Sequence, residues 1–408
     1  MLRSPALAPF RQPAFRAIWT ANLVSNFGSL IQSVGAAWLM TIISGSPQLV
    51  ALVQASATIP IMLLSLFAGA IADSYDRRLV MLFAQTLMLV ASALLALLDY
   101  WGYVAPWSLL LLTFFVGIGT SLNGPAWQAS LRAQVPIEDL PAAVALNSIG
   151  FNLARSLGPA IGGALMALWG ASANFTVNAL SYVGLIVVLL RWRPAYHPPK
   201  RDPLRQAIRA GLAYAFASRA IRRALLRAGV FGVLTAGLWS LMPLVARDLL
   251  HGDQGTYGII LGAFGAGSIG GAFFATSARR VLSNDHVFGI ATLGFAAGVF
   301  GAALAPSAVF AIPFLLVAGA SWVTALSTIN IVVQMTAPPA VVGRCLALYQ
   351  MSAFGGLAVG AYGWGGFAEF VGVKATLIVS GSALAVSALL GLVAPLPQVD
   401  HGAGDKVE

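Results

Sequence analysis

Long stretches without a charged residue constrain this chain more than any other feature of its sequence. The stretch between Arg16 and Asp73 contains 56 residues, and the stretch between Asp285 and Arg344 contains 58. Only 9% of the chain is charged, whereas soluble domains carry about 25% charged residues. A transmembrane helix needs about 20 consecutive, mostly apolar residues. The sequence therefore predicts an all-α protein that crosses a membrane many times.

Turn signals divide the apolar stretches into twelve expected transmembrane helices, six in each half of the chain. Breaks are expected at Ser44-Gly45-Ser46-Pro47, at Trp169-Gly170 and at Ala305-Pro306-Ser307, because glycine and proline interrupt helices. The apolar stretch after Arg16 is too long for a signal peptide, so we expect a retained first helix. The predicted domains are a six-helix bundle over 1–192, a basic linker over 193–222 and a second six-helix bundle over 223–408.

The basic residues predict how the chain is oriented in the membrane. An even number of spans places both termini on one side. If that side is the cytoplasm, 20 of the 23 Lys and Arg residues lie there, leaving Arg247 and Lys374 outside and Arg155 within the membrane. Cytoplasmic loops are the loops that carry such an excess. The same bias accounts for the net charge of +10, so we expect no nucleic-acid partner.

The two halves match when the second is shifted by 202 residues over the first. The matched pairs include Arg77-Arg78 with Arg279-Arg280, Gly117 with Gly319, and Gly170 with Gly372. Six spans in each half make these parallel repeats, which in transporters enclose a substrate site near the midplane. We therefore expect two parallel-repeat six-helix bundles in one monomer.

Residues for several kinds of chemistry are missing from the sequence. The single cysteine, Cys345, excludes a cysteine-based metal site, and no lysine follows a glycine as a Walker A loop requires. The four histidines are far apart in the chain. We expect no catalytic residues, no metal and no cofactor, which leaves an intramembrane enzyme as a remote alternative.

The loop after the second expected span carries a glycine, an acid four residues later and a basic pair. These residues are Gly69, Asp73, Arg77 and Arg78. The arrangement resembles the loop signature of the major facilitator superfamily. The resemblance implies that the glycine allows close helix packing, and that the acid and the arginines form a charge network at the cytoplasmic mouth. It also implies that Asp73 meets the start of the eleventh helix when a gate at this mouth closes.

The fifth expected span carries Gly158, Pro159, Gly162 and Gly163. This pattern resembles the core of the antiporter motif of major facilitator exporters. A proline and small residues let a helix bend and pack closely on its neighbour. The whole chain resembles the twelve-span drug/proton antiporter branch, which contains enterobactin exporters, macrolide-efflux proteins and transmembrane secretion effectors. An arginine-bearing motif that such antiporters often carry in the fourth span is replaced here by Phe114-Phe115-Val116, which puts proton coupling in doubt.

The resemblance implies a secondary active transporter in the bacterial inner membrane, with both termini in the cytoplasm. It implies export of an amphipathic small molecule, drug-like or siderophore-like, by alternating access and proton antiport. The alternative within transport is an importer or flippase of a lipid-like substrate. The expected partners are the small-molecule substrate, the lipid bilayer and protons.

Polar and aromatic residues at helical spacing mark the helix faces turned away from lipid. We expect such residues to line a cavity, although each could instead make a hydrogen bond between helices. The candidates, drawn from both halves, are Asn22, Asn26, Gln32, Trp38, Asn123, Gln128, Asn152, Trp239, Trp322, Asn330 and Gln350.

Arg155 differs in kind from the other candidates because it is a charge in the middle of an expected span. Charges at this depth are costly and usually functional. No acid lies at mid-depth in any expected span, so the cavity should be positive and suit an anionic or hydrogen-bonding aromatic substrate. The alternative is a structural arginine that bonds helix carbonyls, Asn123 or Asn152.

Overall fold

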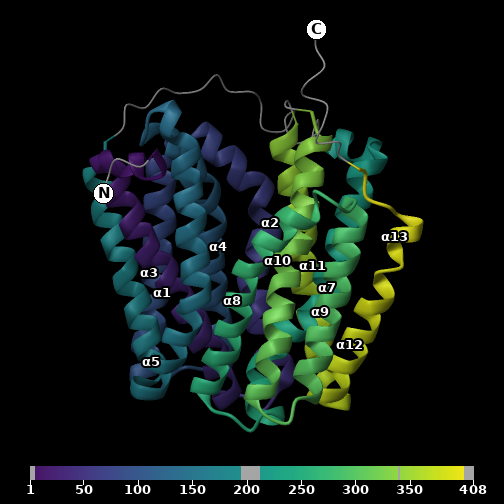
Figure 1. Ribbon diagram of the computed structural model, residues 1–408. Coiled ribbons are helices and arrows are strands. Elements are labelled where there is room, and N and C mark those ends of the chain that lie inside the picture. Colours follow the sequence, from purple (N-terminus) through teal and green to yellow (C-terminus); the bar gives the residue numbers. More distant parts are fainter. Residues whose placement is uncertain (1–4, 194–211, 339–340, 399–408) are drawn as a thin grey trace.

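Long helices form almost all of the structure, a computed structural model that describes residues 5–193, 212–338 and 341–398 (Figure 1). The side chains of residues 5, 70 and 72–74 are not described. The long helices, in chain order, are α1 (Pro13–Ile43), α2 (Pro47–Ser74), α3 (Arg77–Tyr100), α4 (Pro106–Ser130), α5 (Leu140–Arg191), α7 (Arg219–Leu244), α8 (Gln254–Ala278), α9 (Asn284–Leu304), α10 (Ala308–Thr336), α11 (Val342–Val371) and α12 (Val373–Ser387). Short helical segments are η1 (Pro5–Arg11), η2 (Leu131–Ala133), η3 (Ile137–Asp139), the π-helical η4 (Val245–Leu249) and α13 (Leu390–Val393).

Eleven helices in the described residues are long and apolar enough to cross a membrane. The predicted breaks are confirmed, because α1 ends at Ile43 before Pro47 begins α2, and α9 ends at Leu304 before α10 begins at Ala308. The multi-span, all-helical prediction is thus confirmed. The count differs from twelve because α5 is one element of 52 residues.

Helix α5 reverses direction at Gly170, whose backbone is non-helical with φ 78° and ψ −176°. Before this break, a Cβ on Gly150 would lie 3.3 Å from Leu23, and one on Gly158 would lie 3.0 Å from Leu30. After the break, α5 contacts α1 in the opposite order. Asn174 donates to the carbonyl of Ile31 at 3.0 Å, and the Tyr182 hydroxyl lies 3.1 Å from that of Ser29. Helix α5 therefore has two antiparallel arms, and both lie along α1.

The helices pack in two groups that follow the chain order (Figure 1). Helices α1 to α5 contact one another, as do α7 to α12, and the main contacts between the groups are α2 with α11 and α5 with α8. We call these groups the first half and the second half. The segment predicted as a linker, 193–222, contains a helical turn at 212–217 and the first residues of α7, while residues 194–211 lie outside the described part.

The charged residues distinguish the two ends of the bundle. Arg247 and Lys374 are the described basic residues at the end where α1 meets α2; Arg155 lies between the ends, and the remaining described Lys and Arg lie at the other end. We call the end where α1 meets α2 the opposite end, and the end that carries the remaining basic residues the basic end. Helix α1 begins, and α12 finishes, at the basic end (Figure 1).

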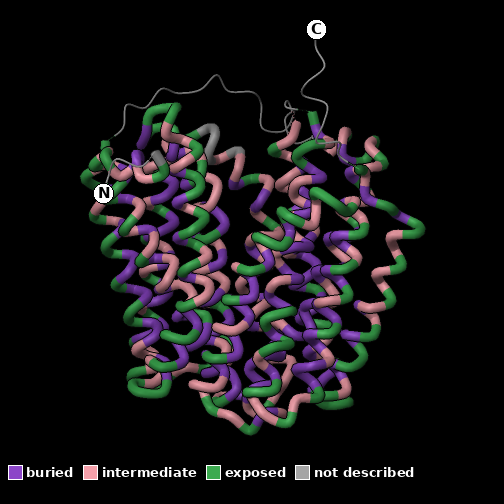
Figure 2. Tube along the Cα trace, viewed as in Figure 1, coloured by how far each residue is buried: buried purple, intermediate pink, exposed green. Residues whose placement is uncertain are grey.

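Buried residues are concentrated inside each group of helices, and exposed residues on its outer faces (Figure 2). Many of the exposed side chains are large and apolar, such as Phe83, Phe273 and Phe370, which are 62%, 74% and 88% exposed. Apolar atoms that face outward in this number are unfavourable in water and favourable in lipid. This distribution agrees with helices embedded in a bilayer.

Candidate functional site

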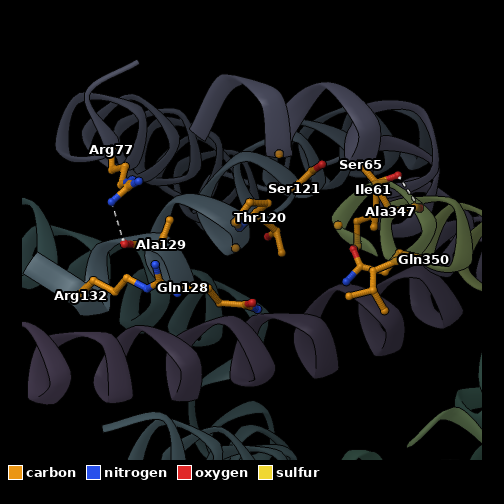
Figure 3. Close-up of a pocket in the computed structure, with 15 residues that line it drawn as sticks. Ile61, Ser65, Arg77, Thr120, Ser121, Gln128, Ala129, Arg132, Ala347 and Gln350 are labelled. Atoms are coloured by element: carbon orange, nitrogen blue, oxygen red, sulfur yellow. Dashed lines mark hydrogen bonds between the residues drawn. The ribbon is translucent and has the colours of Figure 1, made fainter. Parts of the chain in front are cut away.

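A cavity of about 700 Å³ lies between α2 and α4 of the first half and α11 of the second half, near the basic end (Figure 3). Its walls combine short polar, apolar and basic side chains with three glycines. The lining residues are Ile61, Ser65, Gly69, Arg77, Thr120, Ser121, Gly124, Pro125, Gln128, Ala129, Arg132, Gly343, Leu346, Ala347 and Gln350. Both halves therefore contribute to one space, as a transporter site requires.

Two of the predicted cavity residues, Gln128 and Gln350, lie on opposite walls of this space (Figure 3). A smaller cavity of about 390 Å³ between α4 and α5 shares Gln128 and Arg132 with it, and also contains Asn147 and Ser148. The two cavities are thus two lobes that meet at Gln128 and Arg132. None of the described residues that line either lobe is acidic.

The opposite end is closed by contacts between the halves. Trp38 of α1 stacks on Tyr257 of α8 with ring centroids 5.9 Å apart. Arg247 donates to the carbonyl of Thr41 at 2.7 Å, which satisfies an end group of α1. The Ser46 hydroxyl, which caps α2, donates to the carboxylate of Glu369 on α11.

The glycine-rich motif of α5 makes a close backbone contact between the halves. A Cβ on Gly163 would lie 2.8 Å from the Cα of Gly258 on α8, and one on Gly162 would lie 3.1 Å from the Cα of Ile31 on α1. Gly158 and Pro159 are buried. Because Gly163 faces the second half and Gly162 faces α1, the motif packs α5 on both neighbours at once, and close packing through small residues is confirmed.

The two arginines of the loop motif donate to helix carbonyls, and the charge network with Asp73 stays a prediction. Arg77 donates to the carbonyl of Ala129 at 2.9 Å, and Arg78 donates to the carbonyls of Leu189 and Leu190 at 2.7 and 3.0 Å. Both arginines therefore satisfy the C-terminal carbonyls of α4 and α5, where cations are favoured. The side chain of Asp73 lies outside the described part of the chain.

Gly69 does not pack closely on another helix in this structure. A Cβ built on Gly69, or on Gly343 across the cavity, would meet no atom of the described residues within 4 Å. The expected close approach at Gly69 is therefore not present when the cavity is open. Open space at both glycines leaves room for α2 and α11 to approach each other at the basic end.

Arg155 lies between the halves, on the first arm of α5. Its guanidinium carbon lies 5.9 Å from the ring centroid of Trp239 on α7, within the range of a cation–π interaction. Trp239 packs on Phe264 and Trp322 at centroid distances of 4.7 and 5.6 Å. Within the described residues, the guanidinium has no hydrogen bond or ion pair. Its expected partners Asn123 and Asn152 do not bond it: Asn152 donates to the carbonyl of Ser148.

The other predicted cavity residues have varied surroundings. Gln32 accepts from Asn178 at 2.7 Å inside the first half, and Asn330 accepts from Gln334 on the same helix. Both bonds fit the alternative of hydrogen bonding within the bundle. Asn22 is buried, Asn26 is partly buried, and the amide oxygen of Asn123 is buried without a described partner. Trp322, which packs on Trp239, is 5% exposed.

Sequence reasoning missed several residues that line the cavity, above all Arg132. It was counted only as a charge of a cytoplasmic loop, although it follows Gln128 by four residues and so shares its helix face. The small residues Ser65, Gly343 and Ala347 carried no signal in the sequence, because small residues occur equally in tight helix contacts.

Comparison with known proteins gives consistent matches over nearly the whole chain. The sequence profile of the transmembrane secretion effector family matches residues 4–406. An uncharacterized MFS-type transporter of Bacillus subtilis is 26% identical over 94% of this chain and 93% of its own length. The enterobactin exporter of Citrobacter koseri is 27% identical over 93% of this chain and 91% of its own length.

Solved structures are similar in fold at low sequence identity. A bacterial homologue of the human lysosomal transporter Spinster, in an inward-facing and occupied conformation, superposes with a TM-score of 0.76 at 15% identity. The match covers 95% of this chain and 97% of that chain.

Proposed function

Because the chain belongs to the transmembrane secretion effector family of the major facilitator superfamily, whose members are transporters and not enzymes, we propose that it exports an amphipathic small molecule by alternating access. The proposed exporter is a monomer in the bacterial inner membrane and exchanges its substrate for protons. A drug-like or siderophore-like substrate fits relatives that are described as an enterobactin exporter and a macrolide efflux protein.

The proposal includes twelve membrane crossings in two six-helix repeats. The two antiparallel arms of α5 support this count, since each is long enough to cross the bilayer core of about 30 Å. The repeat is supported by Gly170 and Gly372, which lie 202 residues apart and share an unusual backbone conformation, with φ of 78° and 81°. Gly117 and Gly319 also support it, because they lie at matching contacts of α4 with α2 and of α10 with α8.

The observation that carries the proposal is the asymmetry between the two ends. A cavity built by both halves lies near the basic end, while Gly163–Gly258, Trp38–Tyr257 and Arg247–Thr41 join the halves at the opposite end. A space accessible from one side and closed on the other is one state of an alternating-access cycle. With the basic end in the cytoplasm, this state is inward-open and ready to load an exported molecule.

Accumulation of fluorescent dyes and drugs in an efflux-deficient bacterial host tests the proposal. We expect the wild-type protein to lower the accumulation of at least one compound, and a protonophore to restore it. Ala347→Trp fills the cavity and should abolish this effect. Val359→Trp is the matched control, because Val359 lies on the same helix, is 63% exposed and faces away from the cavity.

The same assay separates export from the alternative direction. Higher accumulation with wild type than with Ala347→Trp would indicate uptake and contradict export. Equal accumulation across the whole panel, with both proteins inserted at equal levels, would contradict the proposed function.

A further inference from the structure

We propose, on the basis of the proposed export function, that the substrate is an aromatic organic anion, which enters past Arg132 and binds between Arg155 and Trp239. Three features of the structure carry this inference: a mouth lined by arginines, a polar face on α5 that leads inward, and two donors without described acceptors at its deep end.

The described walls of the cavity mouth carry basic side chains and no acidic one, and the side chain of Asp73 lies outside the described part. Arg77 and Arg132 both line the larger lobe. Arg77 is held by the carbonyl of Ala129, whereas Arg132, at the junction of the two lobes, has no described partner. A cleft lined by one sign of charge concentrates ligands of the opposite sign.

The first arm of α5 connects this mouth with the interior. Ser148 lines the smaller lobe, and Asn152 and Arg155 follow at intervals of four and three residues, which places the three side chains on one helix face. The same arm meets the second half, because a Cβ on Gly265 of α8 would lie 2.8 Å from the Cα of Ser156. The polar face of α5 therefore runs from the mouth to the contact between the halves.

The deep end of this face presents two donors that lack acceptors. The Arg155 guanidinium faces the ring of Trp239, and within the described residues it has no carboxylate partner. The indole Nε1 of Trp239 is buried and has no hydrogen-bond partner. A cation without a carboxylate partner at this depth and a buried, unpaired N–H are both costly. One anionic oxygen between them would satisfy both groups, and the indole ring offers an aromatic face to the rest of the ligand.

The acids of the described helices do not change the sign of this region. Asp99 and Glu369 lie in the last turns of α3 and α11, at the opposite end, and Asp285 lies in the first turn of α9, where it pairs with Arg227. Asp76, Glu138 and Asp139 lie at the basic end, in the cap of α3 and in η3, and none of them is among the described residues that line either lobe. Among the described residues that line the lobes, and at Arg155, an organic cation would therefore meet only like charge. We infer that the site discriminates by charge, beyond a general preference for amphipathic molecules.

Two dyes with the same ring system and opposite charge test this inference. Cells with the wild-type protein and matched variants are loaded with fluorescein, an anion, or rhodamine 123, a cation, and efflux is followed by fluorescence. We expect export of fluorescein and not of rhodamine 123. Arg155→Gln should lower fluorescein export about tenfold or more, the loss typical of one charge-assisted bond. Arg155→Lys, which keeps the charge without the planar fork, should be intermediate.

Further variants separate binding from folding. Arg132→Gln should slow fluorescein export, most clearly at low ionic strength, and Trp239→Phe should weaken it by removing only the N–H. Arg222→Gln is the charge-matched control, since Arg222 is exposed at the same end outside both lobes. Trp364→Phe is the indole control, because Trp364 donates to the carbonyl of Val233 on α7. Insertion and thermal stability are measured for every variant.

The outcomes distinguish this inference from the proposed function. Efflux of rhodamine 123 at the rate of fluorescein, or fluorescein efflux unchanged by Arg155→Gln, overturns the inference. Efflux of neither dye by a protein that still lowers accumulation of other compounds also overturns the anion preference, and leaves export in place. If the wild type changes the accumulation of no compound at all, the proposed function itself fails.

Discussion

Single side chains of the loop motif hold the ends of neighbouring helices at the basic end. Arg77 and Arg78 donate to the C-terminal carbonyls of α4 and α5, so they fix the ends of neighbouring helices in the open state. Asp76 caps α3, because its carboxylate accepts from the backbone N–H of Arg78 at 2.9 Å. The described contacts of the arginines and Asp76 are therefore structural, and the gating role of Asp73 stays a prediction.

We predict that Asp73→Asn strongly reduces transport while the protein still folds and inserts. A carboxylate at this position can bind the positive N-terminal end of α11 when the basic end closes, and an amide loses that charge interaction. Asp76→Asn is the control, since asparagine caps helices as well as aspartate does. Transport is measured per inserted protein, and an Asp73→Asn rate equal to that of Asp76→Asn would remove the gate assignment.

The polar residues show how far a single position can be predicted from sequence. Gln128 and Gln350 line the cavity, whereas Gln32 accepts a hydrogen bond from Asn178 inside the first half. Helical spacing predicts that all three face away from lipid. It cannot tell a cavity from a buried helix contact, because both surfaces avoid lipid for the same reason.

At the scale of helices, the sequence predicted most boundaries because charges and turn residues mark them. Helix α3 begins at Arg77, and proline begins α2 at Pro47 and α4 at Pro106. The reversal of α5 was predicted as a break at Gly170, but not as a break without any loop. One residue with positive φ suffices there, and only glycine adopts this conformation readily.

We predict that Gly170→Ala and Gly372→Ala each destabilise the protein by about 1–3 kcal/mol, because φ near 80° with an extended ψ is accessible essentially to glycine alone. Gly184→Ala is the control, since Gly184 lies within α5, has no atom within 4 Å of a built Cβ and has no positive φ. Thermal unfolding in detergent measures the effect. A melting temperature of Gly170→Ala as high as that of Gly184→Ala would contradict the assignment of strain to this turn.

For the whole molecule, a larger side chain in place of a glycine should have opposite effects on the open and closed states at the two ends. Gly163 touches Gly258 at the closed opposite end, so Gly163→Val should prevent this closure. Gly69 faces open space, so Gly69→Val should be accommodated in the open state and should hinder closure of the basic end. We predict that the first variant favours opening at the opposite end and the second holds the protein open at the basic end.

Cysteine labelling measures this prediction in a Cys345→Ser background, which removes the single native thiol. The reporters are Ala51→Cys, at the buried contact of α2 with Gly365, and Ala347→Cys, on the cavity wall. Gly163→Val should raise labelling at position 51 and lower it at position 347, whereas Gly69→Val should leave position 51 protected. Identical labelling of both variants would contradict alternating access through these two contacts.

The energy source is the last property that belongs to the whole molecule. An antiporter needs a group that binds a proton on one side and releases it on the other, yet the acids of the described helices lie at helix ends. Asp73, Asp99 and Glu369 are the candidates from the sequence. Protonation of Glu369 would weaken its bond from Ser46 and so favour opening of the opposite end. In an antiporter, however, the protonated protein must return to the state in which the opposite end is closed.

We therefore predict that Glu369→Gln does not abolish coupling, and that Asp73→Asn with Asp99→Asn does if a protein carboxylate carries the proton. Export is driven in proteoliposomes by a pH gradient alone or by a membrane potential alone. A negative interior favours anion export by about 2.3 kcal/mol per charge at 100 mV, so an anion exporter can work without a proton carrier. If the triple variant Asp73→Asn, Asp99→Asn, Glu369→Gln still exports when a pH gradient alone drives transport, antiport through these carboxylates is untenable. Export driven by the potential alone would then identify a uniporter of the anion.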